Sequence, residues 1–157
     1  MANRTYNQFQ GTLQKGVVTL FAKVTFDASG VATVVTQETI NASTSPVTIN
    51  PSNGFVSGTV TATVPAVGTN LYTFALQDPY VRLLSASVVT ENIAVPGTSV
   101  IPLNGFVFAD NVNSNSSPSI GLVFVSLDTS SGTIAPGAKL TSCTMLLKLD
   151  LANSTAL

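Results

Sequence analysis

The seven carboxylates are the first candidates for chemistry, because a two-carboxylate hydrolase needs two acids at a set separation, one with a raised pKa. Three of them, Asp27, Asp78 and Asp128, stand where turns or helix caps favour aspartate. We therefore expect structural roles and assign no catalytic residue among them. The acids are scattered singly along the chain: Asp27, Glu38, Asp78, Glu91, Asp110, Asp128 and Asp150.

Nucleophilic catalysis has no better support in the sequence. The chain contains no histidine, which removes the usual general base and the commonest metal ligand. A serine or threonine nucleophile would need a lysine or a carboxylate as its base, and neither Gly-x-Ser-x-Gly nor Ser-x-x-Lys occurs. The single cysteine, Cys143, alternates with Met145 and Leu147 and is predicted to be a core thiol. The sequence predicts that the protein is not an enzyme.

No cofactor or metal site is predicted. Phosphate-binding glycine loops followed by Lys and Ser or Thr are absent from the sequence. Residues 110–113 (Asp-Asn-Val-Asn) are rich in oxygen ligands, but one carboxylate makes a weak calcium site, and an Asx-type turn is the preferred interpretation. Aromatic residues that alternate along strands are interpreted as core rather than as stacking platforms. The aromatic residues considered are Tyr6, Phe9, Tyr72, Phe74, Tyr80, Phe106, Phe108 and Phe124.

The low charge decides which partners are expected. Charged residues make up 8% of the 157 residues, against about 25% in an ordinary soluble domain. A net charge of −1 without a basic run argues against nucleic acid, and no stretch approaches about 20 apolar residues, so no membrane partner is expected. The polar N-terminus has no apolar signal-peptide region. Because hydroxyls and amides are cheaper to desolvate than charges, a surface covered by 17 Ser and 21 Thr favours permanent assembly.

Apolar residues recur with a period of two, which is typical of half-buried β-strands. Residues 38–53 are expected to form a long polar connection with a short strand at 47–49, and residues 111–118 a loop. Residues 78–84 give the only helix-like signal, of about one turn. The expected strands are 18–26 and 31–37 (a hairpin around the turn at 27–30), 55–64, 71–77, 85–91, 99–110, 120–127 and 141–151.

These elements predict an all-β fold: a single antiparallel β-sandwich or barrel, jelly-roll-like, with at most one short helical turn. Residues 1–16 are expected to form an extended N-terminal arm, and residues 17–157 the β-sandwich domain. The stretch 120–127 is apolar at nearly every position, which predicts a central strand or one covered by a partner subunit.

Three stretches carry a resemblance to a known class of proteins. They are Tyr6-Asn7-Gln8-Phe9 leading into residues 16–26, residues 72–84 (Tyr-Thr-Phe-Ala-Leu-Gln-Asp-Pro-Tyr-Val-Arg-Leu-Leu), and the closing Lys148-Leu149-Asp150-Leu151-Ala152-Asn153-Ser154. In this order the chain resembles small virion structural proteins of tailed bacteriophages, of the capsid decoration or cement type. Residues 38–70 have no counterpart in the resemblance.

The resemblance implies a non-enzymatic protein, made in the bacterial host cytoplasm, that binds the outside of the phage head and cross-links capsid subunits. The implied partners are the major capsid protein and the chain itself, as a homotrimer. Residues 120–127 are the candidate trimer seam, and the arm at 1–16 is the candidate capsid contact. The alternative is a host-surface or carbohydrate-binding module of a head fibre or tail component, which rests on the polar loops 38–53 and 111–118.

Overall fold

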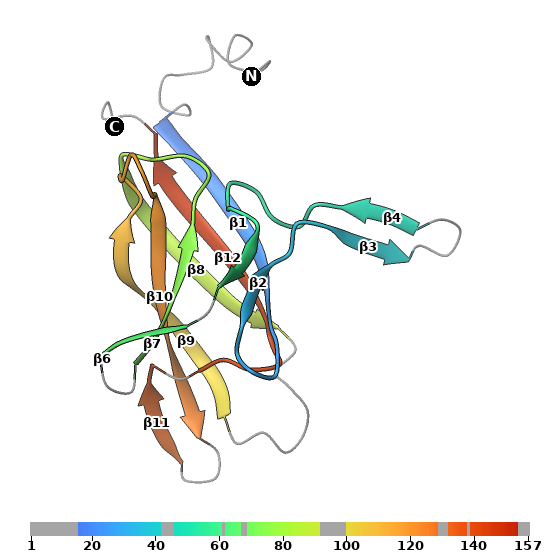
Figure 1. The fold of residues 1–157 in the computed structure, drawn as a ribbon, viewed down its shortest axis with the longest axis vertical. Helices are drawn as coiled ribbons and strands as arrows, with labels where there is room; N and C mark the ends of the chain where they lie inside the picture. Colours follow the sequence, from blue (N-terminus) through green and yellow to red (C-terminus); the bar gives the residue numbers. More distant parts are fainter. Residues whose placement is uncertain are drawn as a thin grey trace.

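The computed structural model describes residues 16–41, 46–60, 62–66, 69–91, 100–128, 132–137 and 139–153. This part of the chain is built from antiparallel β-strands without an α-helix (Figure 1), which confirms the predicted all-β fold. The strands are β1 (Val17–Phe26), β2 (Ala32–Val34), β3 (Glu38–Asn41), β4 (Pro46–Ile49), β5 (Gly58–Val60), β6 (Thr63–Ala66), β7 (Thr69–Ala75), β8 (Arg82–Glu91), β9 (Val100–Asn111), β10 (Ser119–Asp128), β11 (Thr133–Pro136) and β12 (Thr144–Ala152).

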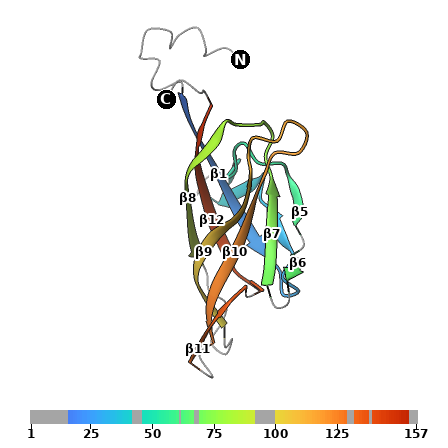
Figure 2. The same ribbon diagram turned by 90° about the vertical axis from the view of Figure 1, so that its left-hand side faces the viewer.

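Two sheets form the body of the molecule and pack face to face (Figure 2). Sheet 1 has the order β5-β2-β1-β12-β8. In sheet 2, β10 pairs with β9 on one side and with β7 and β11 on the other, and β6 extends the sheet beyond β7. The two remaining strands, β3 and β4, form a separate hairpin that projects away from the sandwich (Figure 1).

The centre of sheet 1 joins the two ends of the described chain. Strand β1 pairs with β12 in an unbroken antiparallel register from Val17 opposite Ala152 to Thr25 opposite Thr144. Because side chains alternate between the faces of a strand, Leu20 and its partner Leu149 point into the core, while the neighbouring residues point outward. The hydrophobic alternation seen in the sequence is therefore the alternation between the two faces of this sheet.

An aromatic cluster ties the two sheets together. Phe26 comes from sheet 1, and Tyr72 and Phe124 come from β7 and β10 of sheet 2. Their rings meet edge to face, with centroids 5.2 Å apart for Phe26–Tyr72 and 5.7 Å apart for Tyr72–Phe124. The buried Tyr72 hydroxyl accepts a hydrogen bond from the Leu140 amide at 3.2 Å, so its polar end is satisfied inside the core.

Two expected elements are wrong. Residues 55–64 do not form one strand: β5 joins sheet 1 and β6 joins sheet 2, so the chain changes sheets between them. Residues 78–84 do not form a helical turn, because the amides of Tyr80 and Val81 bond to carbonyls at the ends of other strands instead. The amide of Tyr80 donates to the Val112 carbonyl at 2.7 Å, and the amide of Val81 donates to the Ala152 carbonyl at 2.8 Å.

The connection at 38–53 is more regular than expected. The predicted short strand at 47–49 exists as β4, but it has a partner, β3, which the sequence did not indicate. Glu38 lies opposite Ile49 and Ile40 lies opposite Val47. The expected long loop is therefore a hairpin with short flanking segments.

The aromatic cluster gives a direct test of the core. We expect Phe124→Ala to lower the free energy of unfolding by about 3–5 kcal/mol, because the fully buried ring leaves a cavity between the sheets. The matched control is Phe108→Ala, whose ring is 59% exposed and whose loss should change stability by about 0.5 kcal/mol or less. Urea unfolding measures both, and equal losses for the two variants would contradict this assignment of the core.

Candidate functional site

The outward side of sheet 1 is an open surface of hydroxyl, apolar and charged side chains, which we call the outer face. It is formed by alternate residues of β1, β12 and β8, and the pairing places Phe21 opposite Lys148 and Leu146 opposite Val89. Phe21 is 46% exposed and Val89 is 56% exposed. The outer face consists of Val17, Thr19, Phe21, Lys23, Thr25, Arg82, Ser85, Ser87, Val89, Glu91, Thr144, Leu146, Lys148, Asp150 and Ala152.

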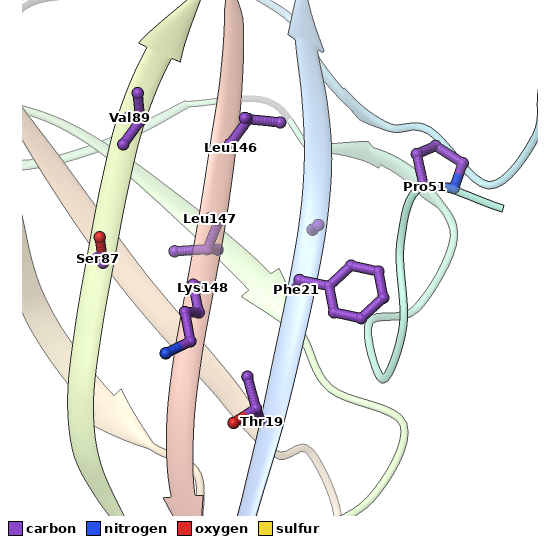
Figure 3. Close-up of a pocket in the computed structure, with 9 residues that line it drawn as sticks. Thr19, Phe21, Pro51, Ser87, Val89, Leu146, Leu147 and Lys148 are labelled. Carbon is purple, nitrogen blue, oxygen red and sulfur yellow. The ribbon is translucent and has the colours of Figure 1, made fainter. Parts of the chain in front are cut away.

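A shallow groove of about 460 Å³ lies on the outer face (Figure 3). The Phe21 ring extends from β1 toward Pro51, while Leu146 and Lys148 of β12 and Val89 of β8 line the part farther from Pro51. Most of this lining is apolar. An open apolar groove on a sheet is suited to a protein surface rather than to a polar metabolite.

At one end of the outer face, the Asp150 carboxylate accepts hydrogen bonds from side chains of β1, β8 and β12 and so links the three strands. Asp150 Oδ1 accepts from the Thr19 hydroxyl at 2.7 Å, and Asp150 Oδ2 accepts from the Ser85 hydroxyl at 2.7 Å. Lys148 Nζ also donates to Oδ2, at 3.1 Å. The hydroxyls of Thr19 and Ser85, together with Lys148, lower the pKa of Asp150 from 3.8 to about 2. This carboxylate is thus held ionised as a link between strands, which is the opposite of what a general acid requires.

The β3–β4 hairpin is fixed to sheet 1 at its base. Asn53 exchanges two backbone hydrogen bonds with Phe21, of 2.7 and 3.3 Å. The buried Ser52 hydroxyl accepts from the Lys23 amide at 3.1 Å and donates to the Val35 carbonyl at 2.6 Å, so it joins both flanking segments to β1. Lys23 Nζ also forms an ion pair with Glu38 Oε1 at 2.6 Å. The hairpin therefore leaves the sandwich from a defined anchor beside the groove.

The hairpin carries apolar side chains into solvent. Val47 and Ile49 of β4 are exposed, as is Thr48 between them. In Figure 1 neither strand of the hairpin lies against the sandwich. Two exposed β-branched apolar residues on a projecting hairpin are typical of an element that binds another surface.

Aromatic residues on β9 are the main site feature that the sequence did not reveal. Phe106 and Phe108, predicted as core, are 52% and 59% exposed. Phe106 lies opposite Val123 on the side of sheet 2 that faces away from sheet 1, and the register shift between Gly121 and Leu122 leaves Phe108 without an opposed residue. Phe106 is exposed because its partner Val123 lies on the side of β10 that faces away from sheet 1, and Phe108 is the extra residue of the bulge.

The other predicted aromatic residues fall into two groups. Tyr72, Phe74, Tyr80 and Phe124 are buried, as predicted. Tyr6 and Phe9 lie outside the described residues, as does the arm at 1–16 except for Gly16.

A second depression of about 390 Å³ lies near Tyr80 and has an amide-rich lining, formed by Pro79, Tyr80, Val81, Asn113, Asn115 and Asn153.

Asp27 and Asp110 have the turn roles that the sequence predicted, whereas the helix-cap role expected for Asp78 is wrong because residues 78–84 form no helical turn. Asp27 Oδ1 accepts from the Ser29 hydroxyl at 2.7 Å and from the Ser29 and Val31 amides at 2.8 Å each, and these bonds lower its pKa. Asp110 Oδ1 accepts from the Val112 amide at 3.2 Å, which is the predicted Asx-type turn. Cys143 is buried, and burial raises the pKa of its thiol to about 11.

The expected trimer seam at 120–127 is wrong for the residues whose side chains are described. Strand β10 is central in sheet 2, and Ile120, Leu122 and Phe124 are fully buried in the core of their own chain. Val123, on the other side of β10, is also buried. The apolar residues on both faces of this stretch are thus explained by a central strand, which the sequence offered as the alternative to a strand covered by a partner subunit.

Comparison with protein families, curated proteins and solved structures gives no match for the chain. Among the described residues, no three His, Cys, Asp or Glu side chains lie close enough together to hold a metal ion. No helix in that part of the chain has the length and hydrophobicity needed to span a membrane. The features that remain for a functional interpretation are the outer face with its groove and the projecting hairpin.

The Asp150 network predicts a defined pH dependence. Because the folded-state pKa is about 2 and the ordinary value is 3.8, the network stabilises the fold above about pH 4, and this contribution is lost as the pH falls toward 2. We expect Asp150→Asn to be less stable than the unchanged chain at pH 6, and the gap to close between about pH 4 and pH 2. Urea unfolding at a series of pH values measures the gap.

A second measurement separates the network from a general effect of charge. Thr19→Val removes the largest single cause of the low pKa, so the Asp150 carboxyl should titrate at a higher pH in this variant. Carbon-detected NMR of the carboxyl groups follows that titration directly. An unchanged Asp150 titration in Thr19→Val would show that the network does not set the pKa.

Proposed function

We propose that this chain is a non-enzymatic virion structural protein of the decoration or cement type, which binds the outside of a bacteriophage head and cross-links its subunits. Its partners are the major capsid protein and other copies of the chain. The protein is made in the bacterial host cytoplasm and resides on the outer surface of the capsid. The observation that carries the proposal is the hairpin with exposed Val47 and Ile49, anchored beside an apolar groove on the outer face.

The chemistry of the outer face supports this proposal. Charged groups in an interface must lose their water, whereas hydroxyls can bond to a neighbouring backbone at low cost. On the outer face, Lys148 is already bonded to Asp150, and Lys23 is paired with Glu38. Arg82 and Glu91 stand at the two ends of β8, and the other side chains of the face are hydroxyl or apolar. Such a surface suits a permanent contact in a repeating shell better than a transient one.

The hairpin and the groove form one continuous contact region in this proposal. Pro51 belongs to the segment that leaves β4 and also lines the groove beside Phe21. A capsid surface that packs on the groove would therefore also meet the base of the hairpin. The resemblance to small phage virion proteins supports the same assignment, since such proteins bind capsids rather than transform substrates.

One observation favours the alternative, a host-surface or carbohydrate-binding module of a head fibre or tail component. The depression near Tyr80 presents Asn113, Asn115 and Asn153 together, and amides bind sugar hydroxyls well. The other loop named for this alternative, 38–53, is a hairpin with an exposed apolar strand, which suits a protein surface instead. The capsid proposal is therefore preferred.

Copy number distinguishes the two functions. Quantitative mass spectrometry of particles of the virus that carries this sequence should find on the order of hundreds of copies spread over an icosahedral head. About a dozen copies or fewer, at a vertex or tail, would support the adhesin instead. Cryo-electron microscopy of the same particles locates the copies.

The hairpin gives the matching mutational prediction. We expect Ile49→Asp to weaken binding to purified undecorated heads at least tenfold, because it places a charge in an apolar contact. Its stability should change by only about 0.5 kcal/mol, since Ile49 is exposed. Thr48→Asp adds the same charge at the adjacent exposed position, whose side chain points to the other face of the hairpin, and should bind almost normally. Equal binding by both variants would contradict the proposed contact.

A further inference from the structure

Strand β8 ends sheet 1 with an unpaired edge. Within the described residues it pairs with β12 on one side, and no strand follows it in the sheet (Figure 2). Its ten residues, Arg82–Glu91, make it one of the longest strands in the described chain. Backbone amides and carbonyls along such an edge are ready to pair with another strand.

This edge lacks most of the usual protection against pairing. Proteins place lysine, proline or inward-pointing charges on exposed edges to prevent them from joining other sheets. Between its two ends β8 has neither charge nor proline, and its sequence there is Leu-Leu-Ser-Ala-Ser-Val-Val-Thr. Its two charged residues stand at opposite ends of the strand, with Arg82 first and Glu91 last. A long edge that has a bulge at Leu84 but no internal charge or proline, with opposite charges at its ends, is suited to antiparallel pairing with its own copy.

We propose that β8 pairs antiparallel with β8 of a second copy, so that sheet 1 continues across a two-fold axis. In such a pair the axis is perpendicular to the sheet, so residues that oppose each other must lie on the same face. The pairing with β12 assigns these faces in β8: Ser85, Ser87 and Val89 are outward, and Ala86 and Val88 are inward. With Ser87 opposite its own copy, Ser85 opposes Val89 and Ala86 opposes Val88, each on a common face.

The irregularity in β8 completes this register. The pairing with β12 shifts between Ser85 and Leu83, so Leu84 is an extra residue in the strand. Beyond it, Leu83 lies inward opposite Leu151, and Arg82 follows on the outward side. Counted through this bulge, Leu83 opposes Thr90 of the second copy and Arg82 opposes Glu91.

Only the Ser87-centred register brings these charges together. Arg82 and Glu91 are both exposed, and the two-fold axis generates the Arg82–Glu91 contact twice, once at each end of the paired strands. Centring on Ala86 would instead place Arg82 opposite Val89 and leave Glu91 without an opposed residue. Opposite charges directly across a strand pair are stabilising, so charge complementarity selects both the occupant, a second copy, and its register.

The first test measures the mass of the purified full chain by light scattering after size exclusion. We expect a dimer, twice the chain mass of 16.2 kDa, at micromolar concentration. Arg82→Glu should raise the dimer dissociation constant about tenfold or more, because it creates two like-charge contacts. The double variant Arg82→Glu with Glu91→Arg should restore the dimer. Lys139→Glu is the matched control, since it makes the same charge change at an exposed residue outside β8.

The second test fixes the register by cross-linking. Directly opposed residues have Cβ atoms about 4.5–5.5 Å apart, so Ser87→Cys should form an intermolecular disulfide under copper-catalysed oxidation. In Ser85→Cys the two new thiols would lie about 13 Å apart, and that variant should not cross-link. The native Cys143 is buried and will not compete.

Neither test requires the capsid, so failure of the β8 pairing can be told apart from failure of the proposed capsid binding. A monomer at micromolar concentration, a trimer, or an open series of higher oligomers would overturn the proposal. So would a dimer that the double charge swap fails to restore, or equal cross-linking of Ser85→Cys and Ser87→Cys. A dimer that loses stability with Arg82→Glu, regains it with the swap and cross-links through Ser87→Cys would establish the pairing, whatever surface the chain binds.

Discussion

The pairing of β1 with β12 is the constraint on which the rest of the structure depends. The two strands come from opposite ends of the described chain, so the contact closes a long loop and must be held by the strands themselves. A slip of one residue would move every apolar side chain of a strand to the opposite face. The observed register places Leu20 and Leu149 inside and Phe21 and Lys148 outside. It also brings Thr19 beside Asp150. The Asp150 carboxylate accepts hydrogen bonds from the hydroxyls of Thr19 and Ser85 and from the Lys148 amine, which keep it ionised and link β1, β8 and β12.

The same alternation explains how much of the fold could be predicted. Strands β1 and β12 were predictable because one face of each is buried and the other is polar, so the period of two is visible in the sequence. The hairpin was only partly predictable: β4 was predicted as a short strand, but its pairing with β3 was not, since β4 is exposed at every position and gives no contrast between faces. The change of sheet between β5 and β6 was missed for a similar reason: Thr alternates with Val or Ala from 59 to 64 without marking where the chain crosses over.

The surface features depend on information that a local pattern does not contain. Phe106 and Phe108 have the spacing of core residues, but β9 is an edge strand with a bulge, and both rings are exposed. Neither the edge position nor the bulge can be read from the nearby sequence. The groove likewise combines Phe21, Leu146 and Val89 from three strands that are distant along the chain. Only the apolar composition of these residues was visible beforehand, whereas their meeting on one open face is a property of the topology.

A two-fold pairing through β8 would give the outer face a geometry suited to a repeating partner. Because the axis is perpendicular to sheet 1, the outer faces of both copies lie on the same side of the extended sheet, and each carries its own groove and hairpin anchor. Two contacts on one rigid body act with a high effective concentration, so each can be weak while the pair remains bound. The groove is mostly apolar, and its one charged lining residue, Lys148, is already bonded to Asp150, so a contact there removes little water from ions. The sparse charge of the sequence and the open edge of the fold thus favour the same mode of binding: copies joined to each other and laid flat on a larger protein surface.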